Sequence, residues 1–181
     1  MTAIGWTRRL AGGADLPGSS PRVRRYRVRA RIARNGDDVA IEDQDGEIAF
    51  SVDGRALQLQ DTLVLRDPYD RPLYRVPPRA MHAGNSVAIE RHDGAEAATV
   101  GRAQVGTMRE RWSVAVPAGE PLRLRGSPAS HEYWIEARGR QVAEVSNRWF
   151  RQPFTYGVAV PPGEDDALLV AIALAVDRMV R

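Results

Sequence analysis

The sequence predicts a mainly β domain, an antiparallel barrel closed around one buried hydrophobic helix near the C-terminus. Three observations support this fold class. Short β-forming runs separated by turn residues fill most of the chain, one run alternates between apolar and charged side chains, and the final segment is apolar on every face. Alternation with a period of two indicates strands, whereas an all-round apolar run of nearly three turns indicates a buried helix.

Turn residues mark the hairpins that this fold class requires. The turn signals are Asn35-Gly36-Asp37, Asp45-Gly46, Asp67-Pro68-Tyr69-Asp70, Asp93-Gly94, Ala118-Gly119 and Arg138-Gly139. From the second signal onward they recur at intervals of about 20 to 25 residues, the length of one hairpin and its connection. No helical period separates them, so we expect serial hairpins in a barrel or a sandwich.

The first strand has one apolar and one charged face. The apolar face consists of Tyr26, Val28, Ala30 and Ile32. The charged face consists of Arg25, Arg27, Arg29 and Arg31. Because a register slip by one residue would bury all four charges, we expect the apolar face to point into the core.

The C-terminal segment predicts a helix over about residues 165–180. Pro161-Pro162-Gly163 ends the last strand, and the acidic residues 164–166 stand where a helix N-terminus favours negative charge. The run Ala167–Val176 has no polar face and is shorter than the roughly 20 residues that span a bilayer. A barrel closed around the helix would bury it. The alternative is a helix on one face of an open sheet, with dimerisation covering its other side.

Composition limits the classes of function. The chain of 181 residues is of ordinary single-domain length. Residues 1–21 are rich in Gly, Ser, Pro and Ala and predict a flexible N-terminal tail. Residues 22–181 form the predicted domain. The absence of cysteine excludes disulfides and thiolate chemistry and is typical of a cytoplasmic protein. All 26 basic residues are arginine and the net charge is +3, which permits anionic partners without requiring them.

No catalytic or metal-binding constellation stands out. The histidines His82, His92 and His131 lack metal-ligand spacing. Ser130 and Glu132 flank His131, but adjacent strand residues point to opposite faces and cannot form a triad, so we expect a structural role for this histidine. We predict no enzymatic activity, no catalytic residue, no metal and no cofactor.

The segment Asp43-Gln44-Asp45-Gly46 looks like part of a calcium-binding EF-hand loop. The first and last ligand positions would be Ile41 and Val52, whose side chains carry no oxygen. We therefore interpret the segment as a hairpin turn.

Several ordered motifs resemble a known family. They are residues 41–47 (IEDQDGE), 50–55 (FSVDGR), 61–67 (DTLVLRD), 131–133 (HEY), 156–158 (YGV) and 162–169 (PGEDDALL). From about Arg25 to Met179 the sequence resembles the LURP-one-related family, which is similar to the C-terminal domain of tubby proteins and to phospholipid scramblases. The resemblance implies a twelve-stranded antiparallel barrel threaded by one hydrophobic C-terminal helix. Among these similar proteins, tubby domains bind phosphoinositide headgroups and scramblases act at membranes.

Neither the calcium-associated stretch of scramblases nor the basic site of tubby proteins is matched residue by residue in this chain. Scramblases carry an acidic, calcium-associated stretch before a motif that matches Tyr156-Gly157-Val158, but here residues 151–155 contain no carboxylate, so the resemblance implies no calcium site. The basic strand residues of the tubby site align to no particular arginine of this chain, so none is carried over.

The arginine strand and the family resemblance together suggest a function. We expect a non-catalytic binding module whose Arg25, Arg27, Arg29 and Arg31 contact anionic phospholipid headgroups at the inner membrane surface. The structural alternative is a solvated edge strand whose charges prevent edge-to-edge pairing. A regulatory adaptor that binds nucleic acid or protein is a second functional class, although only Tyr26 offers a stacking aromatic beside these arginines. A carrier of a small apolar ligand is a third.

Overall fold

The computed structural model describes residues 22–29, 39–53, 62–78, 85–105, 109–117, 119–152 and 155–180. These residues form strands β1 to β12, a short 3-10 helix η2 and one α-helix. The strands are β1 (Arg24–Arg29), β2 (Val39–Asp43), β3 (Ile48–Val52), β4 (Leu63–Arg66), β5 (Pro72–Val76), β6 (Ser86–Arg91), β7 (Glu96–Val105), β8 (Arg109–Ala115), β9 (Leu122–Ser127), β10 (Glu132–Ala137), β11 (Arg140–Ser146) and β12 (Thr155–Val160). The helices are η2 (Pro128–Ser130) and α1 (Asp166–Val180).

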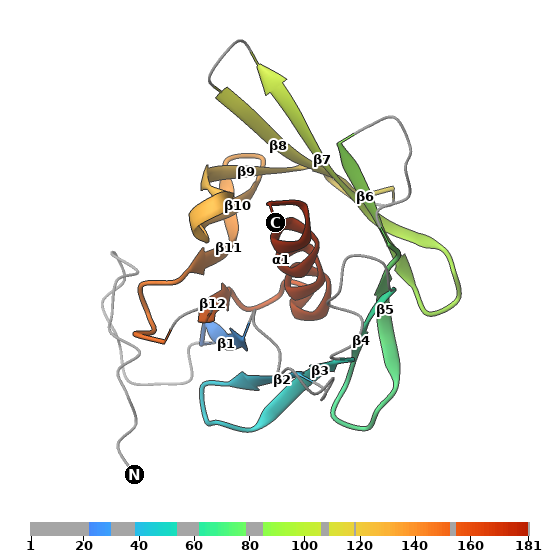
Figure 1. Ribbon diagram of the computed structural model, residues 1–181, viewed down its shortest axis with the longest axis vertical. Coiled ribbons are helices and arrows are strands. Elements are labelled where there is room, and N and C mark those ends of the chain that lie inside the picture. The colour runs from blue at the N-terminus through green and yellow to red at the C-terminus, as the bar shows by residue number, and fades with distance from the viewer. Residues whose placement is uncertain are drawn as a thin grey trace.

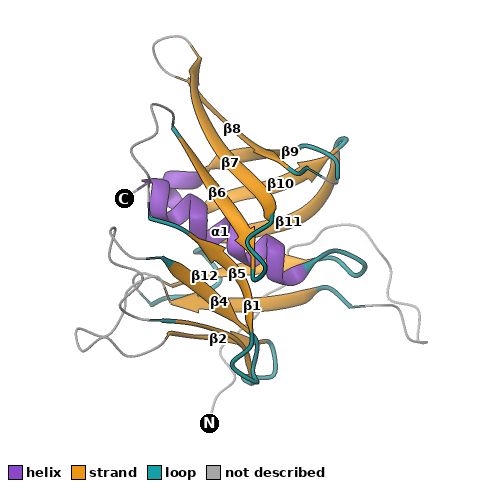
Figure 2. Ribbon diagram, turned by 90° about the vertical axis from the view of Figure 1, so that its right-hand side faces the viewer, coloured by secondary structure: helices purple, strands orange, loops and turns teal. Residues whose placement is uncertain are grey.

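The twelve strands form one closed antiparallel barrel. Each strand pairs with its neighbours in chain order, and β1 closes the ring by pairing with β12. Figure 1 looks along the barrel and shows the strands arranged around α1, and Figure 2 shows the same helix from the side, enclosed by strands. The predicted barrel is thereby confirmed, and the alternative of a helix on one face of an open sheet is wrong.

The core consists of α1 and the inward side chains of the strands. Residues 169–179 of the helix are all buried, and Ile172 is completely inaccessible to solvent. Four alanines in the run 167–175 keep the helix thin enough for the bore of the barrel, because small side chains permit close approach of the surrounding strands. The described residues include no helix with both the length and the apolar character needed to cross a bilayer.

Local sequence explains where α1 begins. The carboxylate Oδ1 of Asp165 accepts a hydrogen bond from the backbone N–H of Leu168 at 2.9 Å, which makes Asp165 the N-cap residue. The helix therefore starts at Asp166, one residue later than predicted. Tyr26 of β1 donates a hydrogen bond to Asp166, and Tyr74 of β5 donates one to Asp165 at 2.8 Å. These contacts fix the N-terminal end of the helix to two walls of the barrel.

The hairpin turns follow the predicted signals wherever the structure describes them. Gly46, Gly94 and Gly139 have φ values of 84°, 85° and 77°, which glycine adopts without steric cost. Asp43 Oδ1 accepts the backbone N–H groups of Asp45 and Glu47, so the segment that looks like an EF-hand loop is a hairpin turn. The signal at residues 35–37, residue 118 and the predicted tail at residues 1–21 lie outside the described residues.

Strand β1 is not an edge strand. It pairs with β12 along its whole length and with β2 at Tyr26 and Arg27. The interpretation of its arginines as protection of a free edge is therefore wrong, because β1 lies between two paired neighbours in the closed barrel. The reason for their outward position is the alternation itself: Tyr26 and Val28 are 6% and 1% exposed and fill the core.

Candidate functional site

The charged face of β1 lies on the outer wall of the barrel. Arg25, Arg27 and Arg29 alternate with buried Tyr26 and Val28 and point away from α1. We call these three residues the arginine face. Arg31, the fourth predicted site residue, lies outside the described residues, as do the core residues predicted at positions 30 and 32.

The arginine face carries more positive than negative charge. Arg27 and Arg29 both form ion pairs with Glu42 of β2, the second at 3.8 Å between Nη2 and Oε1. One carboxylate cannot neutralise two guanidinium groups, so a positive excess remains beside it. Partial burial and the nearby charge of Arg29 hold the pKa of Arg27 below its usual range, as expected for adjacent like charges.

Arg25 has a different environment. The register places it beside Ala159 of β12, which in turn pairs with Glu144 of β11. Burial and the nearby charge of Glu132 raise the pKa of Glu144, whereas Arg25 acts to lower it. At its Arg25 end, the arginine face therefore lies across β12 from the acidic Glu144. Its excess of positive charge lies at the other end, at Arg27 and Arg29.

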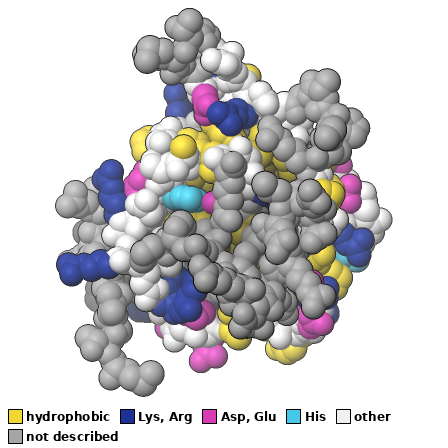
Figure 3. All heavy atoms as spheres, viewed as in Figure 1, with side chains coloured by type: hydrophobic (Ala, Val, Ile, Leu, Met, Phe, Trp, Pro, Cys, Tyr) yellow, Lys and Arg dark blue, Asp and Glu magenta, His cyan; other side chains and the backbone are white. Residues whose placement is uncertain are grey.

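A hollow of about 480 Å³ opens beside that positive end. It is lined by His131, Asn147, Arg148, Phe150, Arg151, Gln152, Thr155 and Tyr156. We call it the rim hollow, because it lies where β10 and β12 begin and β11 ends. Thr155 is the register partner of Arg29, so the rim hollow and the arginine face adjoin each other. Figure 3 shows basic side chains on the side of the barrel where β1, β11 and β12 lie.

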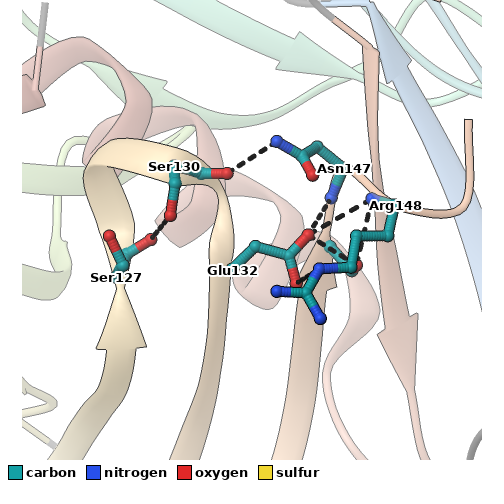
Figure 4. Close-up of polar contacts among 6 residues, drawn as sticks. Ser127, Ser130, Glu132, Asn147 and Arg148 are labelled. Atoms are coloured by element: carbon teal, nitrogen blue, oxygen red, sulfur yellow. Dashed lines mark hydrogen bonds and ion pairs between the residues drawn. The ribbon is translucent and has the colours of Figure 1, made fainter. Parts of the chain in front are cut away.

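Glu132 holds the loop that forms one wall of the rim hollow (Figure 4). Its Oε1 accepts hydrogen bonds from Ser146 Oγ at 2.9 Å, from the backbone N–H of Asn147 at 3.0 Å and from that of Arg148 at 3.2 Å. Its Oε2 lies 3.4 Å from Arg148 Nε. The side-chain amide of Asn147 also donates to the carbonyl of Ser130 at 2.8 Å. The loop between β11 and β12 therefore has a defined geometry at its first residues.

Gly157 receives the next part of this loop. A Cβ atom at Gly157 would overlap the ring of Trp149 and would lie 3.2 Å from Cε2 of Phe150. Both rings consequently pack directly on the backbone of β12. The glycine of the Tyr156-Gly157-Val158 motif is required by this close approach, and it also positions Phe150 in the wall of the rim hollow.

His131 forms the wall of the rim hollow nearest to α1. Its ring stacks on that of Tyr156, with the ring centroids 4.6 Å apart. Its Nε2 lies 2.7 Å from Asp177 Oδ1, and because an ionised carboxylate only accepts, the imidazole donates this hydrogen bond. His131 thus links the barrel wall to α1, which agrees with the structural role expected for it.

Catalytic and metal chemistry find little support in the described residues. Ser130 Oγ donates to the carbonyl of Ser127, so Ser130, His131 and Glu132 each have separate partners and form no triad. No three histidine or acidic side chains of the described ranges are grouped to hold a metal ion. His92 is exposed beside its turn, as expected, and His82 lies outside the described residues.

Comparison with known proteins identifies the family. The sequence matches the LURP-one-related family over residues 25–177. The chain belongs to this family. The fold of this LURP-one-related protein is similar to that in an X-ray structure of a protein from Arabidopsis thaliana, with a TM-score of 0.63, 18% identity, and coverage of 90% of this chain and 94% of that one. At this identity the similarity shows the fold alone. None of the curated proteins shows significant similarity to the sequence.

The structure brings together residues that the sequence did not connect. The predicted Arg25, Arg27 and Arg29 share one surface, but the adjoining rim hollow was missed. Arg148, Phe150 and Arg151 belong to the loop between β11 and β12. The concentration of arginine, aromatic and amide residues in this loop is the sequence feature that could have predicted the rim hollow. The family suggests a binding module, and the outer wall at β1 and β12 is its candidate site.

Proposed function

We propose that this LURP-one-related protein is a non-catalytic binding module that contacts anionic phospholipid headgroups at the inner membrane surface. The observation that carries the proposal is the unequal pairing of Arg27 and Arg29 with the single carboxylate of Glu42. A guanidinium group that is not fully paired with carboxylates can bind phosphate oxygens with two parallel hydrogen bonds.

The surroundings of the arginine face support an extended anionic partner rather than an enclosed ligand. Arg29 is exposed, Arg25 and Arg27 are half-buried, and all three lie on the outer wall of the barrel. An outward-facing surface of this kind can approach a plane of headgroups, where each basic residue contributes about 1 kcal/mol of attraction. The interior of the barrel is occupied by α1, whose buried side chains pack against the strands, so a carrier of a small apolar ligand is not proposed.

Co-sedimentation with vesicles tests the proposal. The wild-type protein should bind vesicles that contain phosphatidylglycerol or phosphatidic acid at low salt, and binding should decrease steeply as salt is added. The double variant Arg27→Gln/Arg29→Gln should bind at least about tenfold more weakly, because two surface charges are removed.

A matched control removes the same charge elsewhere. Arg91 of β6 and Arg111 of β8 are exposed, and these strands flank β7, which lies opposite β1 in the ring of strands. Arg91→Gln/Arg111→Gln should leave vesicle binding within about twofold of wild type. Absence of vesicle binding at low salt, an equal loss in the control, or comparable affinity for random duplex DNA would each contradict the proposal.

A further inference from the structure

The rim hollow has the chemistry of a site for a small anion. Two guanidinium groups, those of Arg148 and Arg151, and two carboxamides, those of Asn147 and Gln152, line it. We propose that the rim hollow binds the phosphate group of a phosphate monoester, with the organic remainder of that molecule held by the carboxamides and the aromatic rings. This site is separate from the arginine face, and it does not depend on whether the arginine face binds lipid.

The charge balance of the rim hollow favours an anionic ligand. Arg148 Nε lies 3.4 Å from Glu132 Oε2, so this carboxylate balances the charge of Arg148, whose side chain is nevertheless 80% exposed. Arg151 is exposed, and no carboxylate of the described residues lies within ion-pair distance of it. A phosphate monoester carries a charge of about −1.5 to −2 at neutral pH and three strong acceptor oxygens, which matches two guanidinium groups that approach one space.

The walls of the hollow are held in place before any ligand arrives. Glu132 and Ser130 fix the backbone and amide of Asn147, and the close approach to Gly157 fixes the aromatic rings that follow. His131, also part of the wall, is held by Asp177 and stacks on Tyr156. Binding therefore requires ordering mainly of the exposed Arg148 and Arg151 side chains, while the rest of the wall is already in place.

The size of the hollow indicates more than an inorganic ion. About 480 Å³ lies within the range of sites for organic ligands, and an inorganic phosphate would leave much of it to water. Carboxamides both donate and accept, so Asn147 and Gln152 can bind hydroxyl groups next to the phosphate. Phe150 adds apolar surface to the same space. A phosphorylated polyol fits this combination, and it can be a soluble metabolite or the headgroup of a monoester lipid.

Calorimetric titration with glycerol 3-phosphate tests the site. We expect saturable 1:1 binding at low salt with a dissociation constant below about 1 mM, much weaker binding of inorganic phosphate, and none of glycerol. Arg151→Gln and Arg148→Gln should each weaken binding at least about tenfold, because each removes charge-assisted hydrogen bonds. The matched control Arg123→Gln, on the exposed face of β9, should bind as wild type does. Each variant should retain the wild-type melting temperature within a few degrees.

Vesicles distinguish the two sources of the phosphate group. If the source is lipid, Arg148→Gln/Arg151→Gln should lose binding to phosphatidic acid, a monoester, but keep binding to phosphatidylglycerol, a diester. If the source is soluble, the double variant should lose glycerol 3-phosphate binding alone. Either result supports the site.

The proposal is overturned if wild-type protein shows no saturable binding of glycerol 3-phosphate, or if Arg123→Gln weakens this binding as much as Arg151→Gln does. If Arg27→Gln/Arg29→Gln no longer binds vesicles but still binds glycerol 3-phosphate, the two sites act independently, and the loss belongs to the arginine face.

Discussion

The imidazole Nε2 of His131 lies 2.7 Å from the carboxylate Oδ1 of Asp177 and joins the barrel wall to the last turns of α1. Asp177 is 3% exposed. A carboxylate near the C-terminus of a helix is disfavoured by the helix dipole, and burial removes its hydration. The hydrogen bond from His131 offsets both costs.

Removal of this hydrogen bond should destabilise the protein. His131 has a φ of 52°, a left-handed conformation that Asn also tolerates, so His131→Asn removes the imidazole without adding backbone strain. We expect the free energy of unfolding to fall by about 2–4 kcal/mol, because a buried carboxylate loses its hydrogen bond from His131. Urea denaturation measures this change.

The double variant His131→Asn/Asp177→Asn provides the test of coupling. It should be less destabilised than the sum of the two single variants, because each single change removes the same hydrogen bond between the two side chains. Ser130→Ala, at the exposed neighbouring position, should change the free energy by less than about 0.5 kcal/mol. Strict additivity of the two single changes would contradict a direct interaction.

Alkaline pH should weaken the fold through three tyrosines. Burial, together with nearby carboxylates, raises the pKa of Tyr26, Tyr74 and Tyr133 above the ordinary value of 10.0. In the unfolded chain they lose their protons near that value, so above about pH 10 the unfolded state binds fewer protons than the folded state. The free energy of unfolding should therefore decrease as pH rises from about 9.5 to 11.5. Denaturation measurements across this interval should show that the free energy of unfolding decreases less steeply with pH in Tyr133→Phe than in Tyr69→Phe, since Tyr69 is 80% exposed.

Gly157→Ala should displace the loop between β11 and β12. The added methyl group would occupy the space of the Trp149 ring, and the ring must move because the backbone of β12 is fixed between β1 and β11. We expect a loss of about 1–3 kcal/mol of stability and a red shift of tryptophan fluorescence. Gly101→Ala is the control: its added Cβ would meet Ser113 Oγ at an ordinary 3.7 Å. A Gly157→Ala spectrum identical to wild type would show that Trp149 does not pack on β12.

A charge in the middle of α1 should prevent folding. Ile172 is fully buried and Leu169 is 4% exposed, so Ile172→Asp or Leu169→Asp places an unpaired carboxylate among strand side chains at a cost of several kcal/mol. Circular dichroism should show loss of cooperative melting. Ile48→Asp introduces the same group at a position that is 52% exposed and should melt almost as wild type does. Cooperative melting of both helix variants near the wild-type temperature would place α1 outside the core.

The sequence was sufficient for most of the fold because its signals are local. Turn glycines such as Gly46 and Gly94, the alternation in β1 and the apolar run of α1 are each visible within a few residues. The boundary of α1 differs by one residue, because Asp165 acts as the N-cap rather than as the first helical residue. Closure between β1 and β12 also follows from the helix, which needs strands on all sides.

The candidate site could be predicted only in part because it depends on distant pairs. The outward direction of Arg25, Arg27 and Arg29 follows from alternation, but their sharing of Glu42 depends on the register of β1 with β2. His131 and Asp177 are 46 positions apart. The rim hollow exists only because the start of β10 and the loop after β11 meet at one end of the barrel. No periodic pattern in the local sequence predicts a contact between segments that are distant in the chain.

The order of the elements along the chain has a consequence for synthesis. Every strand precedes α1, and the ring closes only when β12 meets β1. A ribosome therefore releases twelve strands whose inner faces have nothing to cover them until the helix emerges. Pairing between such distant segments is slow, and uncovered apolar strands aggregate. The nascent chain should depend on chaperones for longer than a helical protein of equal length, and its folding yield should be most sensitive to changes within α1.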